Sequence, residues 1–332
     1  MIKTKIVTDL ESCRALWNSL VQPRHISDLW DFRLCFHRHF KNEPFFLVLE
    51  DKAGLLGMLP LCRLEKEEIF VFFPGETWQG RTWLERSPVF CRDPEALPEI
   101  LSACPPRTYL RYMESDEMDR PAELELDEIG YLLHPPELQF SKDDYYQRFS
   151  WKKLKAIKKE IASILAPESS WHINRLPDFD AMVRMNKNRF EGHSYFHDPR
   201  FMEGFRDVVH WLQGRDWLRM VSLEIRGEIA AVDLGALWHG TYVVFLGGTH
   251  ADFPGVAKAM NMHHIDFAFD QGLSMVDFLC GDFYWKKLWH LDPEPLYKYL
   301  SPSLKSELQP KDELSEGMDF ILPSADLAVA AY

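Results

Sequence analysis

Three carboxylates in the C-terminal third of the chain stand where a freely solvated acid is not expected. Asp233 lies in the apolar run IAAVDLGALW, where a carboxylate is uncommon unless it is paired or functional. Asp277 and Asp282 close and follow a strand-like segment at 274–279, and ligands of α/β sheets often bind beside strand ends. Each has a structural alternative, because a buried Asp can be hydrogen-bonded to its neighbours and an Asp in a turn can cap backbone N–H groups.

A loop that leads into a helix is the second chemical signal. The strand-like run Thr241–Leu246 precedes a turn-prone segment that ends in Pro254-Gly255, and apolar residues then recur at helical spacing. The first N–H groups of a helix lack partners within it and suit a phosphate. We therefore expect a phosphate-bearing group at Gly255, Val256, Ala257 and Lys258. The same pattern is also typical of an ordinary strand–helix–strand packing unit.

Two segments of the chain resemble a known family. Pro254-Gly255, Asp277-Phe278-Leu279-Cys280-Gly281 and Trp285-Lys286-Lys287-Leu288-Trp289 stand in the order found in the CelD-like and Fem-type (FemAB-like) branch of the GNAT acyltransferase superfamily. The N-terminal phrase PFFLVLEDKAGLLGMLPLCR, with Gly57-Met58-Leu59-Pro60-Leu61, resembles the other half of that family. The chain departs from it at Trp285, where the family has Tyr, and in a loop without a compact Gly-x-Gly/Ala cradle.

The resemblance implies an α+β fold with two GNAT-like domains in tandem. Each domain is expected to hold a mixed, mostly antiparallel sheet flanked by helices. Pro135-Pro136 is the best linker signal, so we place an N-terminal domain at 1–138 and a C-terminal domain at 139–332. The second would carry the donor motif and end in a weakly patterned arm from residue 302.

The resemblance also implies N-acyl transfer with acyl-CoA as co-substrate. An amine would attack the acyl carbon while Asp233 serves as general base, Tyr284 protonates the leaving thiolate, and Lys286 and Asp282 complete the catalytic set. Lys286 would hold an anionic group or stabilise developing negative charge; otherwise it is a solvent-facing lysine. The acceptor pocket is assigned to four further residues: Arg189, Tyr195, Asp277 and Trp289.

Two other functions remain open. One is a Fem-type transferase that uses aminoacyl-tRNA, which is disfavoured by the net charge of −13 and by the lack of a long coiled-coil insertion. The other is a non-catalytic binding protein on a GNAT scaffold. The same charge argues against a DNA-binding protein. The acceptor, an amine of a small molecule or of a cell-envelope precursor, is not identified by the sequence, and neither is the oligomeric state.

Composition and motifs predict where the protein acts and whether it binds a metal. No apolar run approaches a membrane span and no signal peptide opens the sequence, so we expect a cytoplasmic protein. Six scattered cysteines form no C-x-x-C pair, which predicts no zinc site. His193 and His197 have the spacing of a metal pair, but Gly192 and Pro199 favour a loop there, so no metal is expected.

A basic segment follows the proposed linker. Residues 141–166 are expected to form one long helix, with an apolar stripe of Trp151, Leu154, Ile157, Ile161 and Leu165. Six cations lie beside this stripe: Arg148, Lys152, Lys153, Lys155, Lys158 and Lys159. They form either a solvated face or a surface that binds an anionic substrate or donor tail.

Overall fold

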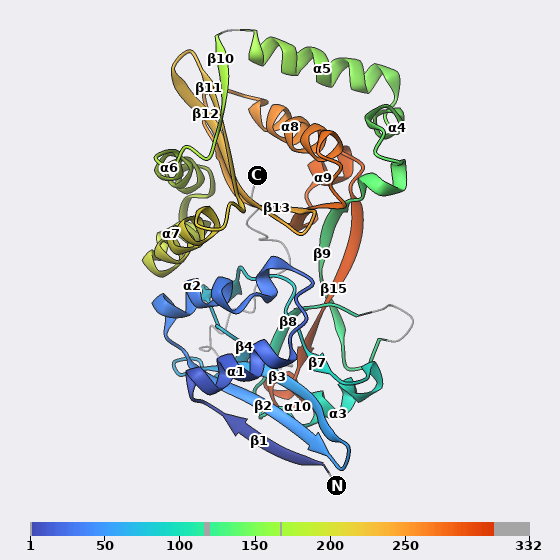
Figure 1. Ribbon diagram of the computed structural model, residues 1–332. Coiled ribbons are helices and arrows are strands. Elements are labelled where there is room, and N and C mark those ends of the chain that lie inside the picture. Colours follow the sequence, from blue (N-terminus) through green and yellow to red (C-terminus); the bar gives the residue numbers. More distant parts are fainter. Residues whose placement is uncertain (1, 116–119, 167, 309–332) are drawn as a thin grey trace, which may run out of the picture. The chain divides into compact units, whose positions relative to one another are not determined.

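The computed structural model describes residues 2–115, 120–166 and 168–308, and it divides them into two compact units (Figure 1). Unit 1 holds the described residues up to Glu128, Arg200–Val208 and the described residues from Pro295. Unit 2 holds Ile129–Pro199 and Val209–Glu294. The chain passes from one unit to the other within β9 (Glu125–Leu133) and β15 (Asp292–Leu300).

Unit 1 is built on an antiparallel sheet in the order β1-β2-β3-β4, with β7 also paired to β3. β8 pairs antiparallel with β15. Its strands are β1 (Lys3–Val7), β2 (Glu43–Asp51), β3 (Gly54–Leu64), β4 (Ile69–Phe72), β5 (Thr77–Trp78), β6 (Arg81–Thr82), β7 (Phe90–Cys91) and β8 (Tyr109–Met113). Its helices include α1 (Leu10–Leu20), α2 (Trp30–Phe40), α3 (Leu97–Ser102) and α10 (Pro302–Leu308).

Local sequence explains the central hairpin of unit 1. Asp51 accepts a hydrogen bond from the N–H of Ala53, and Gly54 takes φ +109°, which lets the chain reverse between β2 and β3. Aromatic residues then close the core. The rings of Trp30 and Phe73 stack at 5.1 Å, and both lie against Phe46.

Unit 2 contains a sheet in the order β10-β11-β12-β13-β14-β9. Every pairing in it is antiparallel except that of β13 with β14. The remaining strands are β10 (Ser169–Ile173), β11 (Leu218–Ile225), β12 (Glu228–Trp238), β13 (Thr241–Thr249) and β14 (Met275–Cys280). The helices of unit 2 are α4 (Lys142–Gln147), α5 (Trp151–Leu165), α6 (Asp178–Phe190), α8 (Val256–Asp270) and α9 (Tyr284–Leu288). Helix α7 (Pro199–Gln213) is divided, with Arg200–Val208 in unit 1 and its remaining residues in unit 2.

Helices cover both faces of this sheet. α8 lies on one face, where His264 reaches Asp233 of β12. α6 lies on the other, so close that a Cβ on Gly248 of β13 would stand 2.6 Å from the carbonyl oxygen of Met182. α5 runs alongside α8 and buries Ile157 and Ile161 in the same core (Figure 1).

The predicted fold class is confirmed, since both units contain mostly antiparallel strands flanked by helices. The single helix over 141–166 is wrong. Ser150 is extended and its side chain accepts from the N–H of Lys153, so a new helix starts at Trp151. The prediction that Trp151 belongs to the apolar stripe of this helix is also wrong, because its side chain is 74% exposed.

The domain boundary at 138 stays a prediction, because the units are interleaved and do not follow a single cut. The arm predicted from residue 302 begins with α10, and the rest of it lies outside the described residues. Among the described helices, none has the length and apolar character needed to cross a bilayer.

Candidate active site

The parallel strands β13 and β14 separate soon after they meet. Their pairing covers only Thr241–Val243 and Met275–Asp277, while β13 continues to Thr249 and β14 to Cys280. Over the described residues, the edges that face each other beyond Val243 therefore share no ladder hydrogen bonds. Such edges present backbone N–H and C=O groups to an extended ligand.

A buried polar relay holds β12, β13 and α8 together. The Nε2 of His264 lies 2.8 Å from Oδ2 of Asp233, and its Nδ1 lies 2.9 Å from the hydroxyl of Tyr242. A neutral imidazole with the proton on Nε2 satisfies both contacts, because Tyr242 then donates to Nδ1. All three side chains are fully buried, and burial raises the pKa of Tyr242.

Gly247 of β13 makes room for this relay. Its register partner across the ladder is Asp233. A Cβ on Gly247 would stand 1.9 Å from Oδ1 of Asp233, so only glycine fits beside the carboxylate. The neighbouring strand thus leaves space for the buried carboxylate of Asp233, because the residue opposite it has no side chain.

The end of β14 is fixed by two of the predicted site residues. Asp277, 2% exposed, accepts from the N–H of Leu279, whose φ of +59° bends the strand. Lys286 is also 2% exposed, and its Nζ donates to the carbonyl oxygens of Leu279 at 2.8 Å and Cys280 at 2.5 Å. The alternative that Lys286 is a solvent-facing lysine is wrong, because its side chain is buried and two strand-end carbonyls accept hydrogen bonds from it.

Asp282 lies just beyond this strand end, beside Tyr131 of β9. It accepts from the Tyr131 hydroxyl and pairs with Lys287 at 2.7 Å. The hydrogen bond from Lys287 is the largest cause that lowers the pKa of Asp282, followed by that from Tyr131. Burial raises the pKa of Tyr131, and the bond to Asp282 adds to the effect.

A cavity of about 440 Å³ adjoins these side chains. Tyr131 and Lys287 form part of its lining, together with Arg148 and His290. Arg148 stands 3.8 Å from Asp292, so the wall carries charges of both signs. Of the six predicted cations, Arg148 is the one that lines this cavity.

The predicted phosphate site at the N-terminus of α8 is already occupied by a side chain of the protein. Gly255 has φ +82°, and Glu160 of α5 approaches so closely that a Cβ on Gly255 would lie 2.6 Å from its Oε1. Both oxygens of Glu160 accept from Lys258, at 2.6 and 2.7 Å. A carboxylate thus lies where an anionic donor group was expected.

The predicted residues fall into separate groups. Lys286 and Asp282 meet at Tyr131, with Nζ of Lys286 5.2 Å from the ring centroid. Asp233 belongs to the α8 layer. Tyr284 is 78% exposed and Trp289 is packed in the core. Arg189 is exposed in α6, and Tyr195, half-buried, follows in the next short helix. The catalytic set and the acceptor pocket assigned to these residues stay predictions.

The sequence identified the acidic residues of the site but not the side chains that contact them. Neither His264, Tyr242, Tyr131 nor Glu160 was placed in the site. The adjacent pair His263-His264 within a helical pattern was the available signal: His264 faces the core, while His263 stacks on Trp171 at 4.2 Å. Among the residues that the structure describes, no cluster of metal-binding side chains is found.

Residues 154–287 match the family described as acetyltransferase (GNAT) domain. This span runs from α5 to α9 and contains the diverging strands, the buried relay and the α8 N-terminus. The chain carries a GNAT acyltransferase domain. The predicted resemblance to the GNAT superfamily is therefore confirmed, and with it the enzyme class of an N-acyltransferase.

Several solved structures are similar to this chain in fold. FemX is 10% identical, with a TM-score of 0.57, over 92% of this chain and 99% of that one. L-PGS from Bacillus licheniformis is 13% identical, with a TM-score of 0.52, over 88% and 91% of the two chains. A protein of unknown function from Bacteroides thetaiotaomicron is 12% identical, with a TM-score of 0.52, over 90% and 99%. These likenesses concern the fold. None of the curated proteins matches this chain in sequence.

Proposed function

We propose that this GNAT chain is an acyl-CoA-dependent N-acyltransferase that acts in the cytoplasm on an amine of a small molecule or a cell-envelope precursor. The observation that carries the proposal is the divergence of β13 from β14 after three paired residues. An extended donor arm lies in that opening, and backbone groups orient its acyl carbon. The amine nitrogen forms a bond to this carbon, the carbon–sulfur bond breaks, and the amine proton leaves as the thiolate gains one.

The predicted catalytic residues take two kinds of role in this proposal. Asp282 and Tyr284 have side chains that reach solvent at the end of β14, so they contact the reacting atoms. Tyr284 protonates the leaving thiolate. Asp233 and Lys286 are buried, and we assign them to positioning: Asp233 fixes β12 against α8, and Lys286 fixes the bend of β14.

The remaining predicted residues form the donor and acceptor walls. Gly255, Val256, Ala257 and Lys258 receive the donor pyrophosphate once Glu160 gives way. The acceptor is held by the residues already assigned to it: Arg189, Tyr195, Asp277 and Trp289. Since Asp277 and Trp289 are buried, they shape this wall from behind.

A second candidate is an aminoacyl transferase with aminoacyl-tRNA as donor. The contact of Glu160 with Lys258 at the α8 N-terminus favours it, because a donor without a pyrophosphate at this place leaves the ion pair intact. The acidic net charge still counts against tRNA. A non-catalytic binding protein is the outcome if neither donor is used.

The test is thiol release from a series of acyl-CoA thioesters in the presence of mixed amines. Tyr284→Phe and Asp282→Asn are expected to lower kcat by about tenfold or more. Asp270→Asn, the same chemical change at an exposed position of α8, is the matched control and is expected to keep full activity. No release with any thioester, together with transfer from aminoacyl-tRNA, would establish the second candidate instead.

A further inference from the structure

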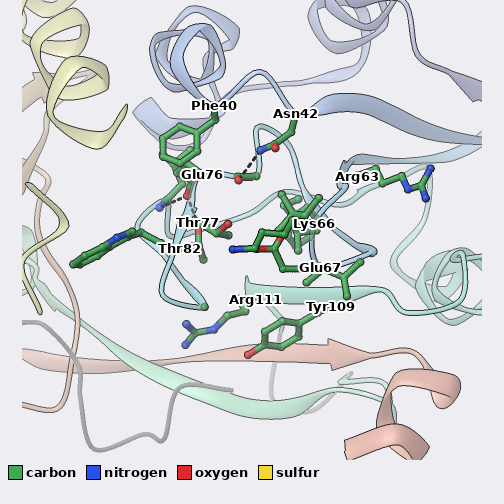
Figure 2. Close-up of a pocket in the computed structure, with 18 of the residues that line it drawn as sticks. Phe40, Asn42, Arg63, Lys66, Glu67, Glu76, Thr77, Thr82, Tyr109 and Arg111 are labelled. Carbon is green, nitrogen blue, oxygen red and sulfur yellow. Dashed lines mark hydrogen bonds between the residues drawn. The ribbon is translucent and has the colours of Figure 1, made fainter. Parts of the chain in front are cut away.

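A cavity of about 600 Å³ lies in unit 1, and all of its lining residues except Arg200 are outside the segment that matches the GNAT family (Figure 2). Its walls come from the end of α2, from β3 and β4, and from the segment that follows them up to Thr82. Figure 2 shows Phe40 and Tyr109 on opposite sides of it, with Glu76 and Thr82 between them. Nothing in the proposed acyl transfer uses this space.

Glu76 is the unusual group in this cavity. It is 2% exposed, and its Oε1 accepts from the N–H of Leu84 at 2.8 Å and from the hydroxyl of Thr82. Among the described residues, no hydrogen bond reaches its Oε2. Burial raises the pKa of this carboxyl, and its hydrogen bonds and the charge of Arg33 only partly oppose the rise. Oε2 is not among the fully buried atoms that lack a partner, so this oxygen borders the cavity, where a ligand can donate to it.

Arg33, the buried cation whose charge acts on Glu76, does not fully neutralise it. The guanidinium of Arg33 donates at 2.7 Å to the carbonyl oxygens of Ser27 and of Phe73. Its electrostatic interaction with Asp28 is stronger than that with Glu76. Asp28 and Glu76 therefore share one positive charge, and the three buried groups carry a net charge of −1 when both acids are ionised.

We propose that this cavity binds a ligand with an ammonium group, which donates a hydrogen bond to Oε2 of Glu76. One added positive charge balances the buried excess of −1 and satisfies the open oxygen. Phe40, Trp78 and Tyr109 offer aromatic walls to the apolar body of the ligand. The lining carries charges of both signs, among them the exposed Lys66 and the half-buried Glu67, and its basic residues outnumber its acidic ones, so the selection for a cation comes from Glu76. This site goes beyond the proposed function and does not depend on acyl transfer.

Tyramine is a suitable probe, because it joins an ammonium to an aromatic ring, and tyrosol is its uncharged analogue. Calorimetry is expected to show tyramine binding at least about tenfold tighter than tyrosol. Glu76→Gln keeps Oε1 as acceptor for Thr82 and Leu84 but removes the charge, and is expected to weaken tyramine binding by at least about tenfold. Glu67→Gln, at the rim of the same cavity, is the control and is expected to stay within about twofold.

A second readout uses the unaltered protein and does not depend on how the variants fold. A bound ammonium favours the ionised form of Glu76, so tyramine is expected to release protons, more at about pH 5 than at about pH 8. Calorimetry in two buffers of different ionisation enthalpy measures this release. Equal affinity for tyramine and tyrosol, unchanged affinity in a folded Glu76→Gln, or no binding of tyramine, tryptamine or cadaverine at about 1 mM would overturn the proposal.

Discussion

Glu160 of α5 and Lys258 of α8 form an ion pair, with Nζ 2.6 Å from Oε1, at the first turn of α8. The pair joins two helices that are packed together, and it places a negative charge at a helix N-terminus. A donor pyrophosphate bound here, as proposed above, would therefore compete with the Glu160 carboxylate for the same lysine.

Removal of the Glu160 charge is expected to improve donor binding. Glu160→Gln should raise the affinity for CoA by about three- to tenfold, and Lys258→Ala should weaken binding by about 1 kcal/mol, because these contacts are partly screened. Calorimetric titration with CoA measures both. Glu228→Gln, an exposed change of the same charge, should leave the affinity unaltered. If Glu160→Gln binds CoA no better than the parent, the donor does not use this helix end.

Lys286 is expected to matter for stability as well as for activity. Lys286→Met keeps most of the apolar stem but leaves the carbonyl groups of Leu279 and Cys280 without their donor. Unfolding in urea should show a loss of about 2–3 kcal/mol. Lys287→Met, one residue on, removes an exposed ion pair with Asp282 and should cost less than about 1 kcal/mol. Equal losses in the two variants would remove the buried role given to Lys286.

The elements of this fold were readable from sequence because their signals are local. The apolar runs that give β12 and β13, and the Pro254-Gly255 turn before α8, each depend on residues within about a dozen positions. Ser150 was a local signal as well. Its side chain caps the N–H of Lys153 and so separates α4 from α5. The helical spacing of Leu154 and Ile157 made the two helices look like one in the sequence.

The chemistry of the site was less readable, because its partners are distant in the chain. Asp233 meets His264 across 31 positions, and Glu160 meets Lys258 across 98. Periodicity places each residue on a face of its own element, but it does not say which side chain of another element that face meets. For this reason the acid at Asp233 was found and the relay around it was not.

Gly247 provides a test of that relay. A Cβ at this position would collide with Oδ1 of Asp233, so Gly247→Ala must push the carboxylate away from His264 or shift β13. The free energy of unfolding should fall by about 3 kcal/mol or more. Gly192→Ala is the control, since a Cβ there meets nothing within 4 Å. A stable Gly247→Ala protein with an unchanged melting temperature would contradict this account of Asp233.

Glu114 is expected to control part of the acid stability of unit 1. Burial alone would raise its pKa, but the hydrogen bond from His25 and the charges of His25, Arg86 and Arg24 lower the pKa to about 2. In the unfolded chain the carboxyl returns to its ordinary value of about 4.3. Because the folded pKa is the lower one, the stabilisation is complete above about pH 4.5 and is lost as the pH falls towards 2.

Thermal melts of the parent protein and of Glu114→Gln measure this contribution directly. Near neutral pH the variant should be less stable by about 2 kcal/mol, because Arg86, itself 5% exposed, loses a charged hydrogen-bond partner. The difference should hold down to about pH 5 and shrink at lower pH. Glu123→Gln, at an exposed site in the same unit, should follow the parent at every pH. If the difference in stability between the parent and Glu114→Gln instead grew as the pH fell, the pKa of Glu114 could not be lowered in the folded state.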